Sequence, residues 1–212
     1  MSRSAAAAST GTRAAHLGPA VRRPLVLDAA LAVWDEEGHR GTTMAAIAAR
    51  AGVSKPVLYE CYANKDDVLR ALLDREESRL MSATQAALPV DDAKGLRATV
   101  AAAYEAFFEA VLAHPVSWRI VVDAQRVMPA AVESRYHRAR EVVVDQIAGL
   151  IRHLTPGGDQ LTDAETRVLA SNFARLAEDN ASLLLRQESG PDAWTPATLA
   201  EFVTRVALDP WA

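Results

Sequence analysis

The sequence predicts an all-α protein in which a small N-terminal domain of three helices precedes a larger C-terminal helical domain. Three observations support this fold. Apolar residues recur at three- and four-residue spacing, no segment alternates with the two-residue period of a strand, and glycine and proline residues separate helix-length segments. The 212 residues suffice for two domains with hydrophobic cores. We expect a disordered arm over residues 1–20 and domains over residues 21–67 and 68–212.

The segment from residue 42 to residue 62 predicts two short helices joined by a tight turn. The first helix extends from Thr43 to about Arg50, and Thr42, Thr43 and Arg50 are expected to be exposed. Gly52 tolerates the positive φ that the turn needs, and Ser54 is placed as the N-cap of the second helix. This arrangement is a helix-turn-helix, which places its second helix in the major groove of DNA.

The helix-turn-helix is flanked by two longer predicted helices. The first should begin near Pro24 and end at Glu37, before Gly38. The second should begin after Asn64, a suitable N-cap, and continue to about Ala87. Leu27, Leu31 and Trp34 form the apolar face expected to support the motif.

A dense set of residues between positions 26 and 69 carries a family resemblance. The set is Val26 to Ala30, Trp34, Gly38, Thr42, Thr43, Ile47, Ala48, Ala51 to Lys55, Leu58, Tyr59, Tyr62, Lys65 and Leu69. It resembles the N-terminal domain of the tetracycline repressor (TetR) family of bacterial transcriptional regulators. The sequence departs from the family pattern at Trp34 and Tyr62, where phenylalanine is usual, at Cys61, where histidine is common, and at Glu60, which adds an acid to the second helix.

The resemblance implies a homodimer that binds a palindromic double-stranded DNA operator and responds to a small-molecule effector. It also implies that Tyr59 and Lys65 contact DNA phosphates. Together with the outward positions of the motif, it predicts a set of DNA-binding residues. They are Thr42, Thr43, Ser54, Lys55, Val57, Tyr59, Tyr62 and Lys65.

The charge of the chain agrees only weakly with DNA binding. The net charge is −4, and residues 1–70 contain nine Lys and Arg against seven Asp and Glu. Phosphate contacts must therefore depend on the placement of individual cations and on their doubling in a dimer. Arg13, Arg22 and Arg23 could extend into an adjacent minor groove, or they could belong to a solvated tail.

The C-terminal part predicts five helices over residues 92–113, 116–127, 129–154, 163–187 and 196–208. Its large aromatic side chains predict an apolar effector site, although each ring alone would be ordinary core. The expected ligand-binding residues are Tyr104, Phe107, Phe108, Trp118, Tyr136 and Asn172. Additional polar candidates are His114, Arg119, Asp123 and His137. A metal site at His114, Asp123 and His137 is less favoured than a helix-surface pair of Glu133 and His137.

The last two predicted helices are amphipathic and adjacent in the chain, which suits half of a four-helix bundle completed by a second copy. Asn172 and Asn180 could fix the register of that bundle, bind an effector or face solvent. The expected dimer interface contains Leu169, Phe173, Leu176, Asn180, Leu184, Leu199, Phe202, Val203 and Val206.

Other functional classes have little support. The sequence contains no glycine-rich phosphate loop after a strand and no nucleophile elbow, so we expect no enzyme activity and no cofactor. The single cysteine, Cys61, is expected to pack in the helix, with a redox switch as the alternative, and it suits a reducing cytoplasm. No run approaches the roughly 20 apolar residues of a membrane span, so we expect no membrane contact. The remaining alternative is a helical small-molecule-binding protein that has lost specific DNA binding, for which Glu60 would be suitable.

Overall fold

A computed structural model describes residues 18–87, 95–127, 130–155, 160–188 and 190–209. These residues form helices and no strand, which confirms the all-α prediction. Two compact units are present. The N-terminal unit contains Met1–Ser78 and Val116–Met128, and the C-terminal unit contains Arg79–Pro115 and Pro129–Ala212. The division falls after residue 78 rather than residue 67, and one segment from the later part of the chain joins the N-terminal unit.

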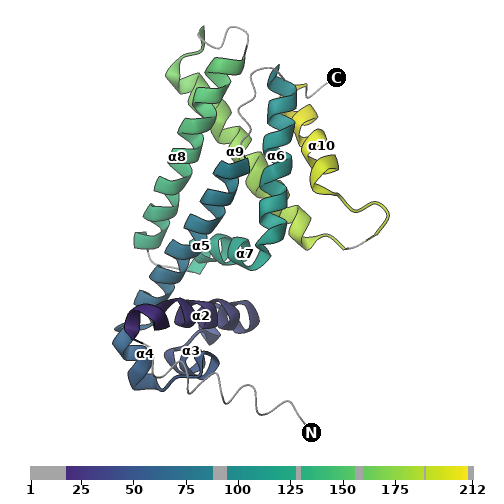
Figure 1. The fold of residues 1–212 in the computed structure, drawn as a ribbon. Coiled ribbons are helices and arrows are strands. Elements are labelled where there is room, and N and C mark those ends of the chain that lie inside the picture. Colours follow the sequence, from purple (N-terminus) through teal and green to yellow (C-terminus); the bar gives the residue numbers. More distant parts are fainter. Residues whose placement is uncertain (1–17, 88–94, 128–129, 156–159, 189, 210–212) are drawn as a thin grey trace. The chain divides into compact units, whose positions relative to one another are not determined.

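The described part of the N-terminal unit contains five helices, one of which it shares with the C-terminal unit (Figure 1). They are α2 (Pro19–Gly41), α3 (Met44–Ala51), α4 (Lys55–Cys61), α5 (Lys65–Ala87) and α7 (Pro115–Val127). Because α5 crosses the division at residue 78, its first half belongs to this unit.

The start of α2 differs from the sequence prediction. The helix begins at Pro19, with Gly18 as its N-cap, and Pro24 lies inside it. Pro24 is the sixth residue of the helix and lies beyond its first turn, so it removes the hydrogen bond that its N–H would donate to the carbonyl of Ala20. Gly38 adopts a left-handed φ of 69° that interrupts the helical geometry, as the predicted stop requires, and Thr42 follows as the C-cap.

Every helix of the N-terminal unit contributes buried apolar side chains to its interior. Leu27 and Trp34 are buried on α2, as the predicted apolar face requires, whereas Leu31 is half-buried. The other buried apolar residues come from each helix of the unit. They are Val26, Val33, Ile47, Leu58, Val68, Leu69, Leu72, Leu73 and Ile120.

A buried polar network joins α5 to α7 and α2. The carboxylate of Glu76 has no exposed surface; it accepts hydrogen bonds from Ser117 Oγ at 2.5 Å and from Arg75 Nε at 2.7 Å. Arg75 also donates to Asp28 on α2 at 2.7 Å. Glu76 is the fully buried member, so a substitution that removes one of its hydrogen-bond donors is destabilising, whereas Asp28 is largely exposed and contributes less. The network therefore fixes α7 in the N-terminal unit.

The C-terminal unit contains α6 (Gly95–Ala113), α8 (Ala130–Leu154), α9 (Asp163–Arg186) and α10 (Pro196–Leu208), together with the second half of α5. Both α9 and α10 begin with a capping box in which a threonine accepts a backbone N–H of the first turn. These starts agree with the predicted ones. The predicted start of α6 at residue 92 and that of α8 at residue 129 lie outside the described residues.

The helices of the C-terminal unit pack in pairs. α6 lies along α10, and α8 lies along α9 (Figure 1). Val144, Ile151, Ala170 and Ala174 form the core between α8 and α9. Tyr104 links α6 to α9, because its hydroxyl donates to the main-chain oxygen of Phe173 at 3.1 Å. Among the described helices, none has a stretch apolar enough, over a sufficient length, to cross a membrane.

Candidate DNA-binding site and effector-binding domain

The turn between α3 and α4 has the geometry that the sequence predicts. Thr43 is the N-cap of α3, and its hydroxyl accepts the N–H of Ala46 at 3.1 Å. Gly52 ends the helix with φ 66° and ψ 31°, and the N–H of Val53 bonds to the carbonyl of Ala48 at 3.0 Å. A left-handed residue with these bonds satisfies the last carbonyls of α3 and redirects the chain.

Helix α4 presents one face to the core and one to solvent. Leu58 is fully buried and Cys61 is 5% exposed, which supports the packing interpretation of the cysteine. Lys55 and Tyr59 lie on the outward face. Ser54 is the N-cap of α4 by its backbone conformation, but its exposed side chain makes no capping bond.

Thr42 does not lie where the sequence prediction placed it. Its side chain is completely buried, and its hydroxyl donates to the carbonyl of Gly38 at 2.8 Å. The expectation that Thr42 is exposed is wrong, because the extra turn after Gly38 returns the chain to the core before α3 begins. Thr43, the next residue, is exposed.

Lys65 and Tyr62 lie at the junction of α4, α5 and α2. The ammonium of Lys65 donates to the carbonyl of His39 at 2.7 Å, so this cation has a structural bond as well as a position near the motif. Desolvation, and then the charge of Lys65, lowers the pKa of His39. Tyr62 is half-buried, burial raises the pKa of its hydroxyl, and the guanidinium of Arg23 lies 5.8 Å from its ring centroid.

The acid on α4 is paired. Arg22 Nη1 of α2 lies 2.8 Å from Glu60 Oε2, and the two side chains are 11% and 55% exposed. Arg22 is therefore a nearly buried helical residue, and neither of the two alternatives, a minor-groove arm or a solvated tail, describes it. Arg13, the other arm candidate, lies outside the described residues. Sequence inspection missed this pair because the two residues are 38 positions apart.

The fold and this surface define a DNA-binding protein of the helix-turn-helix class, and comparisons with known proteins identify the family. The family model for bacterial regulatory proteins of the tetR family matches residues 26–72. The transcriptional activator FasR of Mycolicibacterium smegmatis is 30% identical over 169 residues, which cover 79% of this chain and 74% of FasR. The chain belongs to the TetR family of bacterial transcriptional regulators.

Two further kinds of similarity agree with this assignment. The regulator BetI of Burkholderia cenocepacia strain HI2424 is 36% identical over 88 residues, which cover 40% of this chain and 45% of BetI. A TetR-like regulator from Rhodococcus sp. RHA1 superposes with a TM-score of 0.67 at 28% identity, covering 91% of this chain and 96% of that one. A second Rhodococcus RHA1 protein of the tetR family has a TM-score of 0.69 at 17% identity, with 87% and 94% covered, and shows the fold alone. The family is regulatory rather than enzymatic.

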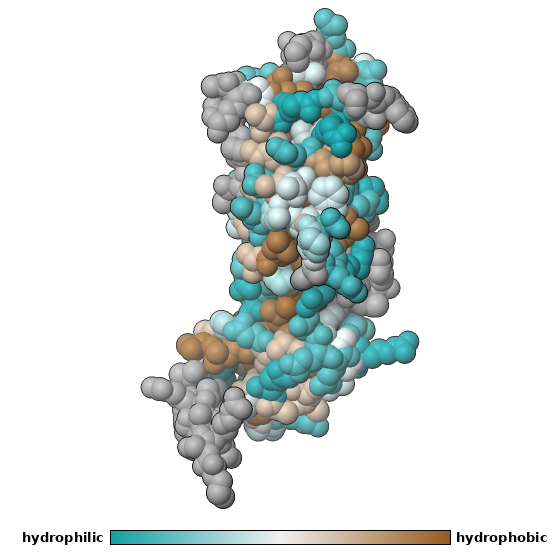
Figure 2. Space-filling view, turned by 90° about the vertical axis from the view of Figure 1, so that its right-hand side faces the viewer, coloured by the Kyte–Doolittle hydropathy of each residue, from teal (hydrophilic) through white to brown (hydrophobic). Residues whose placement is uncertain are grey.

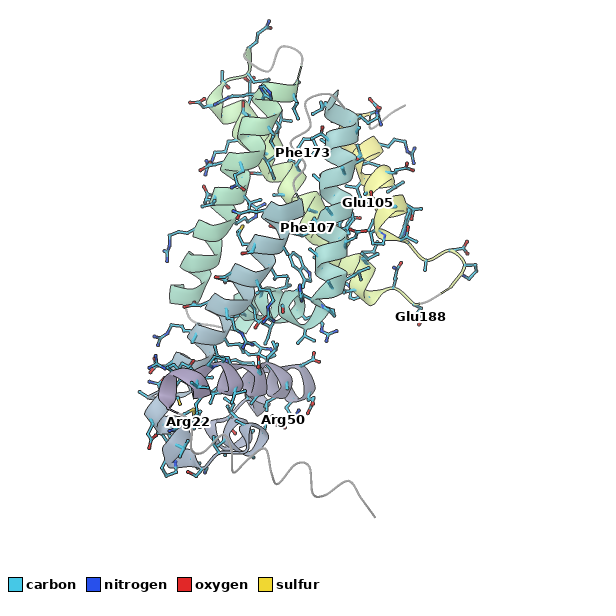
Figure 3. All side chains as sticks on the ribbon, viewed as in Figure 1. Arg22, Arg50, Glu105, Phe107, Phe173 and Glu188 are labelled. Carbon is cyan, nitrogen blue, oxygen red and sulfur yellow. The ribbon has the colours of Figure 1, made fainter. Side chains whose placement is uncertain are left out.

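The structure brings together part of the predicted effector site. Tyr104 and Phe108 on α6 are buried, with ring centroids 6.0 Å apart, and the ring centroid of Phe173 lies 6.4 Å from that of Tyr104. Figure 3 labels Phe173 on α9 and Phe107 on α6. Phe107 is half-buried against Phe108 at 5.9 Å. Burial raises the pKa of Tyr104 far above its ordinary value.

Three other ligand predictions have different outcomes. Asn172 is exposed on α9, so its expected position in an interior site is wrong. Trp118 is buried in the N-terminal unit, whereas Tyr104 and Phe108 belong to the C-terminal unit. The side chain of Tyr136 lies outside the described residues, as do those of Asp123 and His137. The described part of the chain contains no cluster of three or more His, Cys, Asp or Glu able to hold a metal ion.

The predicted dimer residues divide into an inward and an outward set. Leu184, Leu199 and Val203 are almost completely buried in their own chain, so their expected position on a shared surface is wrong. Leu169, Phe202 and Val206 are exposed large apolar side chains, as predicted, and Phe173, Leu176 and Asn180 are half-buried. Asn180 donates to Leu176 O of its own helix at 2.8 Å.

Other exposed apolar residues of α9 and the segment before α10 are not among the residues of the expected dimer interface. These residues are Val168, Leu183 and Trp194. Figure 2, viewed from the side on which α10 lies in Figure 1, shows hydrophobic side chains among hydrophilic ones on this face. Trp194 packs against Phe202 with ring centroids 5.2 Å apart, and Gln187 accepts the backbone N–H of Trp194 at 2.8 Å. Folding therefore orders these rings while leaving them accessible.

Proposed function

We propose that this regulator binds a palindromic operator as a homodimer and that a small apolar or amphipathic effector releases it. DNA binding is supported by the outward face of α4, on which Lys55 and Tyr59 are exposed. Thr43 and Ser54, the N-cap residues of α3 and α4, are exposed as well. Hydroxyl and ammonium groups of this kind bind phosphates and position a recognition helix. Lys55 and half-buried Val57 then face base edges or the adjoining backbone.

Dimerisation is supported by the exposed apolar residues Leu169, Leu183, Phe202 and Val206 on α9 and α10. Large side chains of this kind are favourable on a surface that a second copy covers. A twofold dimer also matches the symmetry of a palindrome, in which recognition helices enter major grooves about 34–36 Å apart. Two copies double the few phosphate contacts that one chain can make.

Effector binding is supported by the aromatic group of Tyr104, Phe107, Phe108 and Phe173 in the C-terminal unit. Aromatic side chains with few polar groups favour an apolar or amphipathic ligand. The ligand lowers operator occupancy to the extent that it binds the released state more tightly than the DNA-bound state. With an operator that overlaps a promoter, this makes the protein a repressor.

Activation is the second candidate, because the relative FasR is named an activator. The sign of regulation depends on where the operator lies relative to the promoter. A reporter fused to the selected operator and its native promoter distinguishes the two: deletion of the regulator raises expression for a repressor and lowers it for an activator.

A carrier that has lost DNA binding is less well supported than the sequence indicated. Arg22 offsets the charge of Glu60, so the acid on α4 does not oppose phosphates as an isolated charge. Selection of random double-stranded DNA with the purified full-length protein tests the choice. We expect enrichment of one palindrome, with affinity that falls steeply as salt rises. If no sequence is enriched, operator binding is refuted.

A further inference from the structure

Glu60 occupies an unusual position for an acid. It lies on the exposed face of α4 and in the last turn of that helix, where the negative end of the helix dipole disfavours a carboxylate. DNA phosphates would repel the same charge. A role in recognition would require both that this charge be offset and that the carboxylate remain accessible.

Arg22 meets both requirements. Its guanidinium donates to Glu60 Oε2 at 2.8 Å and comes from the start of α2, a separate helix (Figure 3). The arginine side chain is only 11% exposed, so packing restricts its rotamers, while the glutamate side chain remains 55% exposed. No other described residue bonds to Glu60, which leaves Oε1 open to an incoming donor.

We infer that Glu60 is a specificity-determining residue that reads a cytosine in each half of the operator, and that Arg22 is its positioning residue. A carboxylate only accepts hydrogen bonds. In the major groove, cytosine presents the N4 amino donor beside an apolar C5–H, whereas adenine places the acceptor N7 beside its amino group. An oriented carboxylate therefore favours cytosine over adenine.

The pair is not needed to fasten α4 to α2. Leu58 and Cys61 already bury one face of α4 in the core that contains Val26 and Val33 of α2. Because the Glu60 side chain is 55% exposed, water screens its attraction to Arg22 and reduces what the pair adds to stability. Orientation of an accessible acceptor explains the pair better than stability does.

The inference rests on the proposed operator binding, and the test separates the two. Full-length wild type and Glu60→Gln are each used to select random double-stranded DNA, and single-base variants of the wild-type operator are then titrated. At one symmetric pair of positions, wild type should prefer C·G over T·A and A·T by at least about fivefold. Glu60→Gln should lose this preference or change it to adenine, because an amide both donates and accepts.

A matched control is available in the same unit. Glu36 is 54% exposed and paired with Arg50, so Glu36→Gln removes a comparable acid from another arginine. Glu36→Gln should leave every base preference unchanged, and Arg22→Lys should weaken discrimination only at the position that Glu60 reads. If wild type enriches a palindrome and Glu60→Gln enriches the same one with equal discrimination, the inference is wrong and operator binding stands. If wild type enriches nothing, operator binding itself fails and the inference with it.

Discussion

Thr42 and Thr43 are adjacent and chemically identical, yet the structure gives them opposite roles, which two substitutions can separate. Thr42→Val keeps the shape of a fully buried side chain and removes the bond from its hydroxyl to Gly38 O, 2.8 Å long. A hydrogen bond of this kind contributes about 0.5–1.5 kcal/mol. The Gly38 carbonyl keeps its bond from the Thr42 backbone N–H at 3.1 Å, so we expect a loss of about 0.5–1 kcal/mol.

For a unit of this size, that loss lowers the melting temperature by roughly 2–8 °C. Operator affinity should change by less than about twofold below the melting temperature, because Thr42 has no surface for a phosphate to contact.

Thr43→Asp should have the opposite effects. Aspartate caps a helix at least as well as threonine. Its carboxylate can accept the same Ala46 N–H that the Thr43 hydroxyl accepts, so the folding stability should be preserved. The new charge should repel the phosphate that Thr43 is proposed to bind, weakening operator binding about tenfold or more.

Thermal unfolding by circular dichroism and fluorescence anisotropy with the selected operator measure the two quantities. The assignment is refuted if Thr42→Val binds DNA several times more weakly while folded, or if Thr43→Asp binds as wild type does.

Three further outcomes follow from the structure. Lys65→Met should reduce the slope of log K against log salt by about 0.9 for each protomer, and an unchanged slope would remove Lys65 from the phosphate contacts. Phe202→Asp should convert the dimer to monomers in light scattering, whereas Val142→Asp, at a similarly exposed site on α8, should not; a Phe202→Asp variant that remains dimeric would contradict the interface. Desolvation and the charge of Lys65 lower the pKa of His39 in the folded protein. As the pH falls, the His39 imidazole is therefore protonated first in the unfolded chain. The contribution of neutral His39 to folding stability is complete above about pH 6.5 and is lost as the pH falls toward the folded-state pKa. Thermal unfolding at pH 7.5 and 5.5 should therefore show a smaller acid-induced loss for His39→Gln than for wild type, and equal losses would show that His39 is not responsible.

The features that the sequence predicted well depend on nearby residues. Gly52 is left-handed as expected, and the side chain of Asn64 accepts the N–H of Asp67 at 2.9 Å as an N-cap should. Caps and turns are built from residues within a few positions of one another, so their chemistry can be read along the chain.

The orientation of faces was predicted less well. Val203 and Phe202 are neighbours on α10 and both were expected on a dimer surface, yet only Phe202 is exposed. Spacing reveals that a helix has an apolar face, but packing decides which helix covers that face. In this protein α10 packs along α6, which is distant in the sequence.

The amino-acid sequence alone was enough for the all-α class, the turn of the recognition motif and the family, because each depends on local patterns. Tertiary structure decided the electrostatics of the site. It paired Glu60 with Arg22 across 38 positions, Lys65 with His39 across 26, and Glu76 with Ser117 across 41. Charges and donors separated so far along the chain interact only after the core has formed, since apolar burial, which is non-directional, brings their helices together.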